Sequence, residues 1–501
     1  MSNEIVLMEN RQLIPRWHTS RKATALQFPN RQKFQVKQPE LPRDPWLSEA
    51  RLEWKRKRSV LSATELNASL DLHNMTDDSD YIETRSFLLD NLDKVPSGLS
   101  DALKNSANYA DDDSYYATNV LKVRLIISRL KKLVAEYPRD WLAWSDVAFY
   151  YALLGEDERA LRCLQISSNA CPRNAYILRS HARFLVHLGK PEEALFILKK
   201  SGDIKNNPLI ASGALAISEA FDLPSISVSS CKRLLKSYSG DPVFSSDLLA
   251  SLGTIEFRNG NLKKAKEYFA MSFKNPSENA LSQYGWLHHK HGFNAPVDNG
   301  GLLSSSIESQ VNRLYVQSDF QGCRSKLIEL HQFQPFTDAP LTDAGYISLL
   351  GLEDPEFVIE LSQNRSSYRA MSFGELNNFI VAKLVLNDLS SIEGLLGLLA
   401  EKARKDQASD QRGVFLATAG MFMFKAGNID EGRFLYQEAI NHFGTRNSLR
   451  ASALAKFFYA ENLTGIDDRA REKLLASAAS IAKRCSMHEL LGKKSLAKYL
   501  E

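Results

Sequence analysis

The residue types that could carry chemistry gather at two places in the sequence, and neither place holds a complete site. The densest cluster is His288, His289 and His291, which are candidate zinc ligands. A zinc site needs a fourth ligand of suitable geometry, and on a helix these three side chains point in different directions. His488 and Glu489 begin like the helix of a zinc protease, but the second histidine of that motif is missing. We therefore expect no metal site and no cofactor.

The motifs of nucleotide hydrolysis and of nucleophilic catalysis are also incomplete. The segment 492–495, Gly-Lys-Lys-Ser, resembles the end of a phosphate-binding loop, but the position of the motif's first glycine is taken by Met487. The sequence contains no G-x-S-x-G elbow, and no cysteine has placed histidine and asparagine partners. We therefore expect a protein that is not an enzyme and has no catalytic residue.

The composition is that of a folded, water-exposed protein. Of the 501 residues, 44% are hydrophobic and 24% are charged, which is ordinary for soluble globular domains. No stretch approaches the roughly 18 apolar residues of a membrane span, and the first residues do not resemble a secretion signal. The five cysteines have no C-x-x-C spacing, so we expect reduced thiols. These features predict a cytoplasmic protein without membrane insertion.

The positive charge of the chain is concentrated at its N-terminus. Residues 1–60 contain 13 Lys and Arg residues against 6 Asp and Glu residues, while the whole chain has a net charge of only +4. Such a segment could attract an acidic protein, a nucleic acid or an anionic surface. Because no nucleic-acid motif accompanies the charge, we place an acidic protein first.

Prolines recur at nearly equal intervals along a chain that is otherwise patterned as helices. Pro138, Pro172, Pro208, Pro242 and Pro276 are separated by 34, 36, 34 and 34 residues. Proline ends a helix and biases the residue before it toward an extended backbone, so this interval indicates a repeated helical hairpin. A hairpin this short cannot bury its apolar face alone, and we expect neighbouring hairpins to stack into a solenoid.

Small and aromatic residues occupy matching positions in these hairpins. In the clearest copy, Trp144 and Ala148 lie on one face of a first helix, and Gly155 ends that helix. This pattern resembles the tetratricopeptide repeat (TPR), a 34-residue helix pair. The resemblance is clear over residues 121–292 and looser in most of the chain beyond them. It implies an all-α, TPR-like solenoid, a superhelical stack of antiparallel helix pairs, here with an extended N-terminal arm.

The sequence divides into five segments. They are a basic, Pro- and aromatic-rich arm with a first amphipathic helix (1–60), an acidic-loop helical connector (61–117), clear TPR-like repeats (118–293), a break with degenerate repeats (294–365), and C-terminal TPR-like repeats with a capping helix (366–501). The break begins where residues 294–301, rich in Asn and Gly, replace an expected second helix.

The resemblance places candidate ligand contacts on the first helices, which line a concave groove. Aromatic rings supply desolvated area, and guanidinium groups hold carboxylates with two hydrogen bonds. The candidates for this partner-binding groove are Phe149, Tyr176, Arg179, Arg183, His187, Phe257, Arg258, Trp286, His289 and Lys290. An acidic or C-terminal peptide fits such a groove, although solvated Arg and Lys side chains are also common on helix faces.

The N-terminal arm combines prolines with large apolar rings. Residues 1–45 contain five prolines, and Trp17, Phe28 and Phe34 lie between basic residues. Because such rings are costly to leave in water, we expect the arm to dock through them, either on its own solenoid or on a partner.

Three functions are compatible with this sequence. The leading hypothesis is a non-catalytic scaffold or adaptor that binds a protein or peptide, preferably an acidic one, in the concave groove and joins it to a multiprotein complex. The second is a regulatory subunit or sensor whose solenoid changes shape on ligand binding. The third is a nucleic-acid-associated protein that uses the basic arm, which predicts strongly salt-dependent binding.

Overall fold

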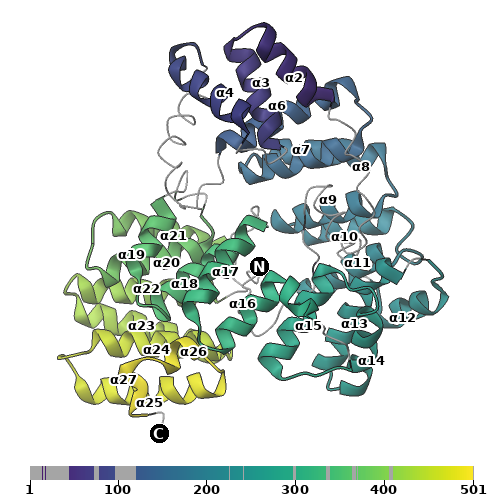
Figure 1. Ribbon diagram of the computed structural model, residues 1–501. Helices are drawn as coiled ribbons and strands as arrows, with labels where there is room; N and C mark the ends of the chain where they lie inside the picture. The colour runs from purple at the N-terminus through teal and green to yellow at the C-terminus, as the bar shows by residue number, and fades with distance from the viewer. Residues whose placement is uncertain are drawn as a thin grey trace.

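The structure of this protein is a computed structural model that describes residues 14, 17, 45–72, 78–95, 120–224, 226–240, 242–296, 301–333, 339–363, 368, 371–405 and 410–499. Every regular element among these residues is a helix. Successive helices pack as antiparallel pairs joined by short turns, and the pairs stack side by side (Figure 1). The protein is therefore an all-α solenoid, which confirms the predicted fold class. The predicted N-terminal arm lies outside the described residues, except for Ile14 and Trp17.

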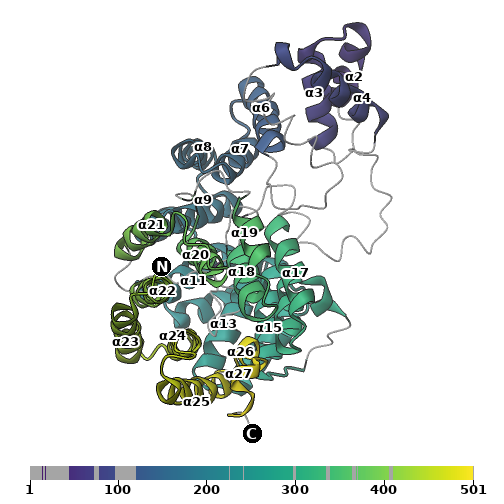
Figure 2. The ribbon, with the colours of Figure 1, turned by 90° about the vertical axis from the view of Figure 1, so that its left-hand side faces the viewer.

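Three helices near the N-terminus form a small packed group. They are α2 (Pro45–Arg56), α3 (Val60–Leu72) and α4 (Ser79–Asp90), followed by the 3-10 turn η2 (Leu92–Lys94). Trp54 is buried in this group, with its ring 5.0 Å from the ring of Phe87. Helix α3 also contacts α6 (Val120–Glu136), which connects the group to the array. Figures 1 and 2 show α2–α4 at one end of the molecule, with the C-terminus at the other.

The first half of the array consists of helix pairs whose limits agree with the proline spacing. The pairs are α7 (Trp141–Leu153) with α8 (Asp157–Ala170), α9 (Ala175–His187) with α10 (Pro191–Lys200), α11 (Pro208–Phe221) with α12 (Val228–Ser237), and, after η3 (Pro242–Ser245), α13 (Ser246–Arg258) with α14 (Leu262–Ser272). Pro138 precedes α7, and Pro208 is the first residue of α11. Proline is tolerated there because the first turn of a helix does not use its backbone N–H groups internally.

Glycine has two separate roles in these pairs. Gly155 and Gly189, at the turns inside the first two pairs, have φ angles of 69° and 75°, a left-handed conformation that glycine adopts without strain. Gly253 instead lies where α13 meets α14, and a Cβ atom added there would lie 2.8 Å from the ring of Phe269. The missing side chain therefore lets these two helices approach closely.

The array continues through a segment without a long helix. After α15 (Glu278–His291), residues 292–306 include the 3-10 turn η4 (Leu302–Ser305), and residues 297–300 lie outside the described part. Helix α16 (Ile307–Val316) then packs against α15. The stack is therefore continuous from α15 to α16.

The second half repeats the pairing and ends against the middle of the array. Its helices are α17 (Phe320–Phe333), α18 (Ala339–Leu350), α19 (Pro355–Gln363), α20 (Phe373–Val385), α21 (Ile392–Lys405), α22 (Gln411–Lys425), α23 (Ile429–Thr445), α24 (Leu449–Asn462), α25 (Asp468–Arg484), α26 (His488–Leu491) and α27 (Lys494–Ala497). Helices α22, α23 and α24 are seen nearly end-on in Figure 2. The short helix α26 packs against both α25 and α18, so the C-terminal end closes onto the middle of the chain.

The hydrophobic core extends along the array instead of gathering at one centre. One cluster is built from α6 to α9, and the next is built from α9 to α13. Further clusters follow toward the C-terminus, such as the one between α24, α25 and α26. A distributed core is what a stack requires, because each pair can bury its apolar faces only against its neighbours.

Candidate functional site

The first helices of successive pairs form one continuous surface. Helices α7, α9, α11, α13 and α15 contact each other in this order (Figure 1), and we call the surface that they form the inner face. Several polar side chains on these helices are buried. They include Ser145, Ser180, Ser212, Ser251, Thr254 and Gln283. Buried groups of this kind serve the packing of the helices: Oγ1 of Thr254, for example, lies 3.0 Å from the carbonyl oxygen of Ala250 and 3.0 Å from Oε1 of Gln283 on α15.

Trp17 of the N-terminal arm lies on this inner face, between α7 and α9. Its ring is only 1% exposed. The ring centroid lies 5.3 Å from that of Phe149, with the planes at 86°, and 5.5 Å from that of Phe184, with the planes at 56°. We call Trp17, Phe149 and Phe184 the Trp17 site. The arm is thus in contact with its own solenoid at this residue.

Ile14 is buried farther along the same array. It is 5% exposed and belongs to the cluster built from α9 to α13, whereas Trp17 belongs to the cluster built from α6 to α9. In the order of the helix pairs, the cluster of Trp17 therefore precedes that of Ile14, which is the reverse of their order in the sequence. Phe28 and Phe34, the other rings through which we expect the arm to dock, lie outside the described residues.

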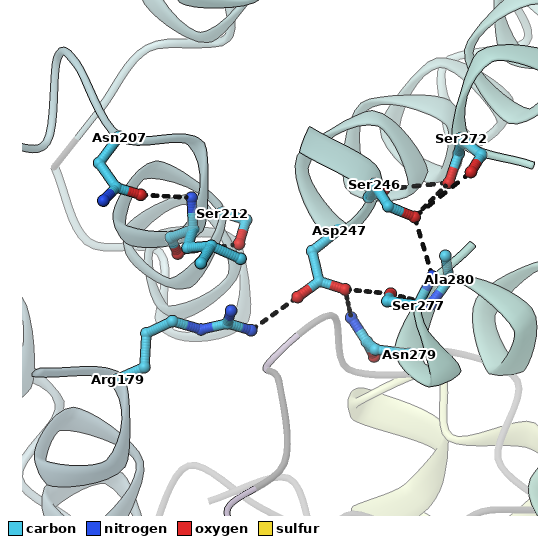
Figure 3. Close-up of polar contacts among 10 residues, drawn as sticks. Arg179, Asn207, Ser212, Ser246, Asp247, Ser272, Ser277, Asn279 and Ala280 are labelled. Atoms are coloured by element: carbon cyan, nitrogen blue, oxygen red, sulfur yellow. Dashed lines mark hydrogen bonds and ion pairs between the residues drawn. The ribbon is translucent and has the colours of Figure 1, made fainter. Parts of the chain in front are cut away.

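Arg179 of α9 is held by a carboxylate of the same chain. Its Nη2 atom donates a hydrogen bond of 2.7 Å to Oδ2 of Asp247 on α13 (Figure 3). The Oγ atom of Ser277 donates to Oδ1 of the same carboxylate at 2.5 Å, and Nδ2 of Asn279 lies 3.5 Å from it. Since Ser277 is the N-cap of α15, Asp247 connects three first helices. The guanidinium group of Arg179 thus already has a carboxylate partner within the protein.

The other candidate residues on α9 and its neighbour α7 differ in accessibility. Phe149 and Arg183 are buried, Tyr176 is half-buried, and His187 is exposed. The His187 ring stacks on Phe184 with 6.0 Å between the centroids. His187 therefore lies at the outer edge of the Trp17 site.

The second group of candidates lies on α13 and α15. Trp286 is buried, and the exposed Arg258 places its Cζ atom 6.0 Å from the centroid of the Trp286 ring. Phe257 is half-buried, with its ring 5.3 Å from that of Phe293. The structure thus distributes the candidates over two pairs of first helices, α7 with α9 and α13 with α15.

The positive charge of the inner face is smaller than its residue types suggest. Arg179 is paired with Asp247. Burial, together with the neighbouring His288 and Arg313, lowers the pKa of His289 to about 4, so this ring is neutral near pH 7. Burial and the nearby Arg450 also lower the pKa of Lys290. An acidic ligand would therefore meet less positive charge on this face than the sequence suggests.

The histidine cluster does not assemble a metal site among the described residues. His288 lies 3.2 Å, through Nδ1, from the carbonyl oxygen of Phe293, and its ring packs edge-on against that of His289. Nowhere in the described part of the chain do three His, Cys, Asp or Glu side chains come together in a way that could hold a metal ion. Among the same residues, no helix is long and apolar enough to cross a membrane.

Two features of this surface were missed by the sequence analysis. Phe184 forms the second wall of the Trp17 site but is not among the predicted groove residues, although Arg183 and His187 of the same helix are. The carboxylate of Asp247 was missed because it lies 68 residues from Arg179. The signal for Phe184 was present, since it lies one hairpin length after Phe149.

Comparison with known proteins adds one structural likeness. No family model matches the chain, and no curated protein matches it. Among solved structures, the crystal structure of yeast Tom70 is similar at 13% sequence identity, over 80% of this chain and 95% of the Tom70 chain, with a TM-score of 0.31. A TM-score this low supports no conclusion about function. The assignment of the fold depends on the helix pairs described above.

Proposed function

We propose that this protein is a non-catalytic, TPR-type scaffold that binds an extended segment of a partner protein on its inner face and holds it in a larger assembly. One observation carries the proposal: two side chains of the N-terminal arm are already buried in the array, Trp17 against Phe149 and Phe184 of the first helices and Ile14 in the cluster built from α9 to α13. A surface that accepts one segment of this kind has the shape and the chemistry for another.

The chemistry of the inner face favours a partner with a large apolar anchor. Phe149 and Phe184 surround a ring from the arm, and buried aromatic anchors contribute most of the binding energy at many interfaces. An acidic residue beside that anchor would meet His187 on α9, and one farther along the segment would meet Arg258 on α13; both side chains are exposed. We therefore propose an extended segment with an aromatic anchor and acidic flanks as the partner.

The test is affinity capture with the full chain and matched variants. His187→Glu/Arg258→Glu places two carboxylates on the inner face without touching the Arg179–Asp247 pair, which has a structural role. The control is Phe196→Ser, since Phe196 is 63% exposed on the second helix α10. We expect the inner-face variant to retain less than about a tenth of the captured partner and the control to retain all of it. A partner that is lost with the control and kept with the inner-face variant contradicts the proposal.

A regulatory role is the second candidate, and the same observation favours it. Because residues of the arm lie on the face that we propose for binding, a partner would change the position of the arm when it binds. Small-angle scattering of the full chain with and without the captured partner tests this role. The partner is contrast-matched so that only this chain contributes to the scattering, and a chain profile that does not change on binding supports the scaffold alone.

A further inference from the structure

We propose that the Trp17 site is the anchor subsite of the inner face and that it binds a tryptophan of the partner. This tryptophan belongs to an extended segment in which an aliphatic residue lies three positions before it (aliphatic-x-x-tryptophan). The arm of this chain occupies the site until such a segment displaces it. This inference rests on the proposed function, because it assigns the partner chemistry and the regulation of the same surface.

Two aromatic rings surround Trp17 in defined orientations. Phe149 presents its ring at 86° to Trp17, and Phe184 presents its ring at 56° from the next first helix. Edge-to-face and tilted arrangements at these distances are the preferred contacts between aromatic rings. The site is therefore shaped for a large flat ring and lies between two helix pairs, where a segment crossing the array would place one.

Ile14 and Trp17 are three positions apart in the sequence. An extended segment advances about 3.3 Å per residue, so two residues of a partner with this spacing would lie about 10 Å apart. Packed helices are about 8–10 Å apart. An extended segment with this spacing therefore reaches two neighbouring clusters of the array, as Ile14 and Trp17 do. Pro15 lies between them in the sequence and disfavours a helix there.

The helices around Trp17 have a core of their own. Val147 and Ala148 of α7 are buried with Leu164 of α8 in the cluster that Trp17 joins, and α7 contacts both α8 and α9. Residues 18–44 separate Trp17 from the start of α2. Trp17 is thus added to a formed surface by a segment of the same chain, and an intramolecular segment competes with any segment that is added in trans.

The experiment measures occupancy of the site without any partner protein. The probe is a fluorescein-labelled peptide of residues 10–21, added to the full chain and to the full-chain variant Ile14→Ser/Trp17→Ala. We expect the peptide to bind the variant at least about tenfold more tightly than the unchanged chain, by fluorescence anisotropy, because the tethered arm competes only in the latter. A peptide with alanine in place of its tryptophan should bind neither chain.

Two controls test whether peptide binding depends on the Trp17 site. Adding Phe149→Ala to the double variant should abolish peptide binding, whereas adding Leu52→Ser should not, because Leu52 is 68% exposed on α2. If the double variant does not fold, judged by circular dichroism, Trp17→Phe replaces it. This change keeps a ring in the site, and the peptide should bind that chain with intermediate affinity.

Two outcomes would overturn the proposal. Equal binding of the peptide to the unchanged chain and to a folded variant would mean that the arm does not occupy the binding site. Absence of binding to a folded variant would mean that the site does not accept a segment in trans. Both outcomes are distinct from failure of the proposed function, which appears only in partner capture and leaves the peptide assay unchanged.

Discussion

The hydroxyl group of Tyr315 on α16 donates a hydrogen bond of 2.5 Å to the carboxylate of Glu489 on α26, although 174 residues separate them. The Tyr346 hydroxyl donates to the other oxygen of that carboxylate at 2.6 Å, and Nη2 of Arg450 lies 3.1 Å from it. The Glu489 side chain is fully buried. One carboxylate therefore joins α16, α18 and α24 to the C-terminal segment and closes the second half of the array.

Removing this carboxylate should loosen the closure. Glu489→Ala leaves the largely buried Arg450 without its anion, and breaking a buried ion pair in this way costs roughly 3–5 kcal/mol. In a stacked array the loss should be local, so we expect faster hydrogen exchange in α16, α18 and α26 and little change in α7–α9.

The control for this prediction is a surface ion pair in the same region. Glu472 pairs with Lys498 at 2.8 Å, and both side chains are more than half exposed. Exposed pairs contribute about 0–1 kcal/mol, so Glu472→Ala should leave exchange in α16 and α18 unchanged. Equal effects of the two variants would show that Glu489 is not the connecting residue.

The pair of Arg179 and Asp247 should behave as a structural link between first helices. Arg179→Ala leaves the carboxylate of Asp247, which is 7% exposed, with hydroxyl and amide partners but without a cation. We expect a loss of about 1–3 kcal/mol in unfolding free energy. A double-mutant cycle with Asp247→Asn should show a coupling above about 0.5 kcal/mol, and strictly additive effects would exclude a direct pair.

The sequence was sufficient for the local features of this fold. Proline and glycine mark the ends of helices through backbone geometry, which depends on neighbouring residues alone, so the repeat from Pro138 to Pro276 predicts the helix pairs. The sequence was not sufficient to predict the partners of Arg179 and Glu489, because these partners lie 68 and 174 residues away. A charged residue that is neutralised inside the fold is also the same residue type as one that binds a ligand, so its role cannot be told from its type.

Gly253 provides a test of how closely the paired helices approach. In Gly253→Ala, the added Cβ would lie 2.8 Å from Phe269, whose ring is fully buried. Overpacking of this kind costs roughly 1–3 kcal/mol. The matched control is Gly397→Ala in α21, where no atom lies within 4 Å of the added Cβ. That change should stabilise by roughly 0.5–1 kcal/mol through helix propensity. Thermal unfolding of the two variants should therefore shift in opposite directions.

His181 should make the stability of the first helix pairs depend on pH. The ring is 4% exposed on α9, and its Nδ1 atom lies 2.9 Å from Oγ of Ser168 on α8. Burial lowers the pKa of His181 from 6.5 to about 4, although the nearby Glu193 acts in the opposite direction. The unfolded chain therefore binds a proton between pH 6.5 and 4 that the folded chain does not.

The direction of the change in stability with pH follows from that difference in proton binding. The stability is fully present above about pH 6.5 and is lost as the pH falls toward 4, by roughly 3 kcal/mol for a shift of this size. His181→Gln should flatten this part of the profile of melting temperature against pH, because glutamine does not titrate. The control Phe196→Ser changes an exposed side chain on the neighbouring helix α10 that does not titrate and should keep the slope. A profile that stays equally steep in His181→Gln would show that another group causes the dependence.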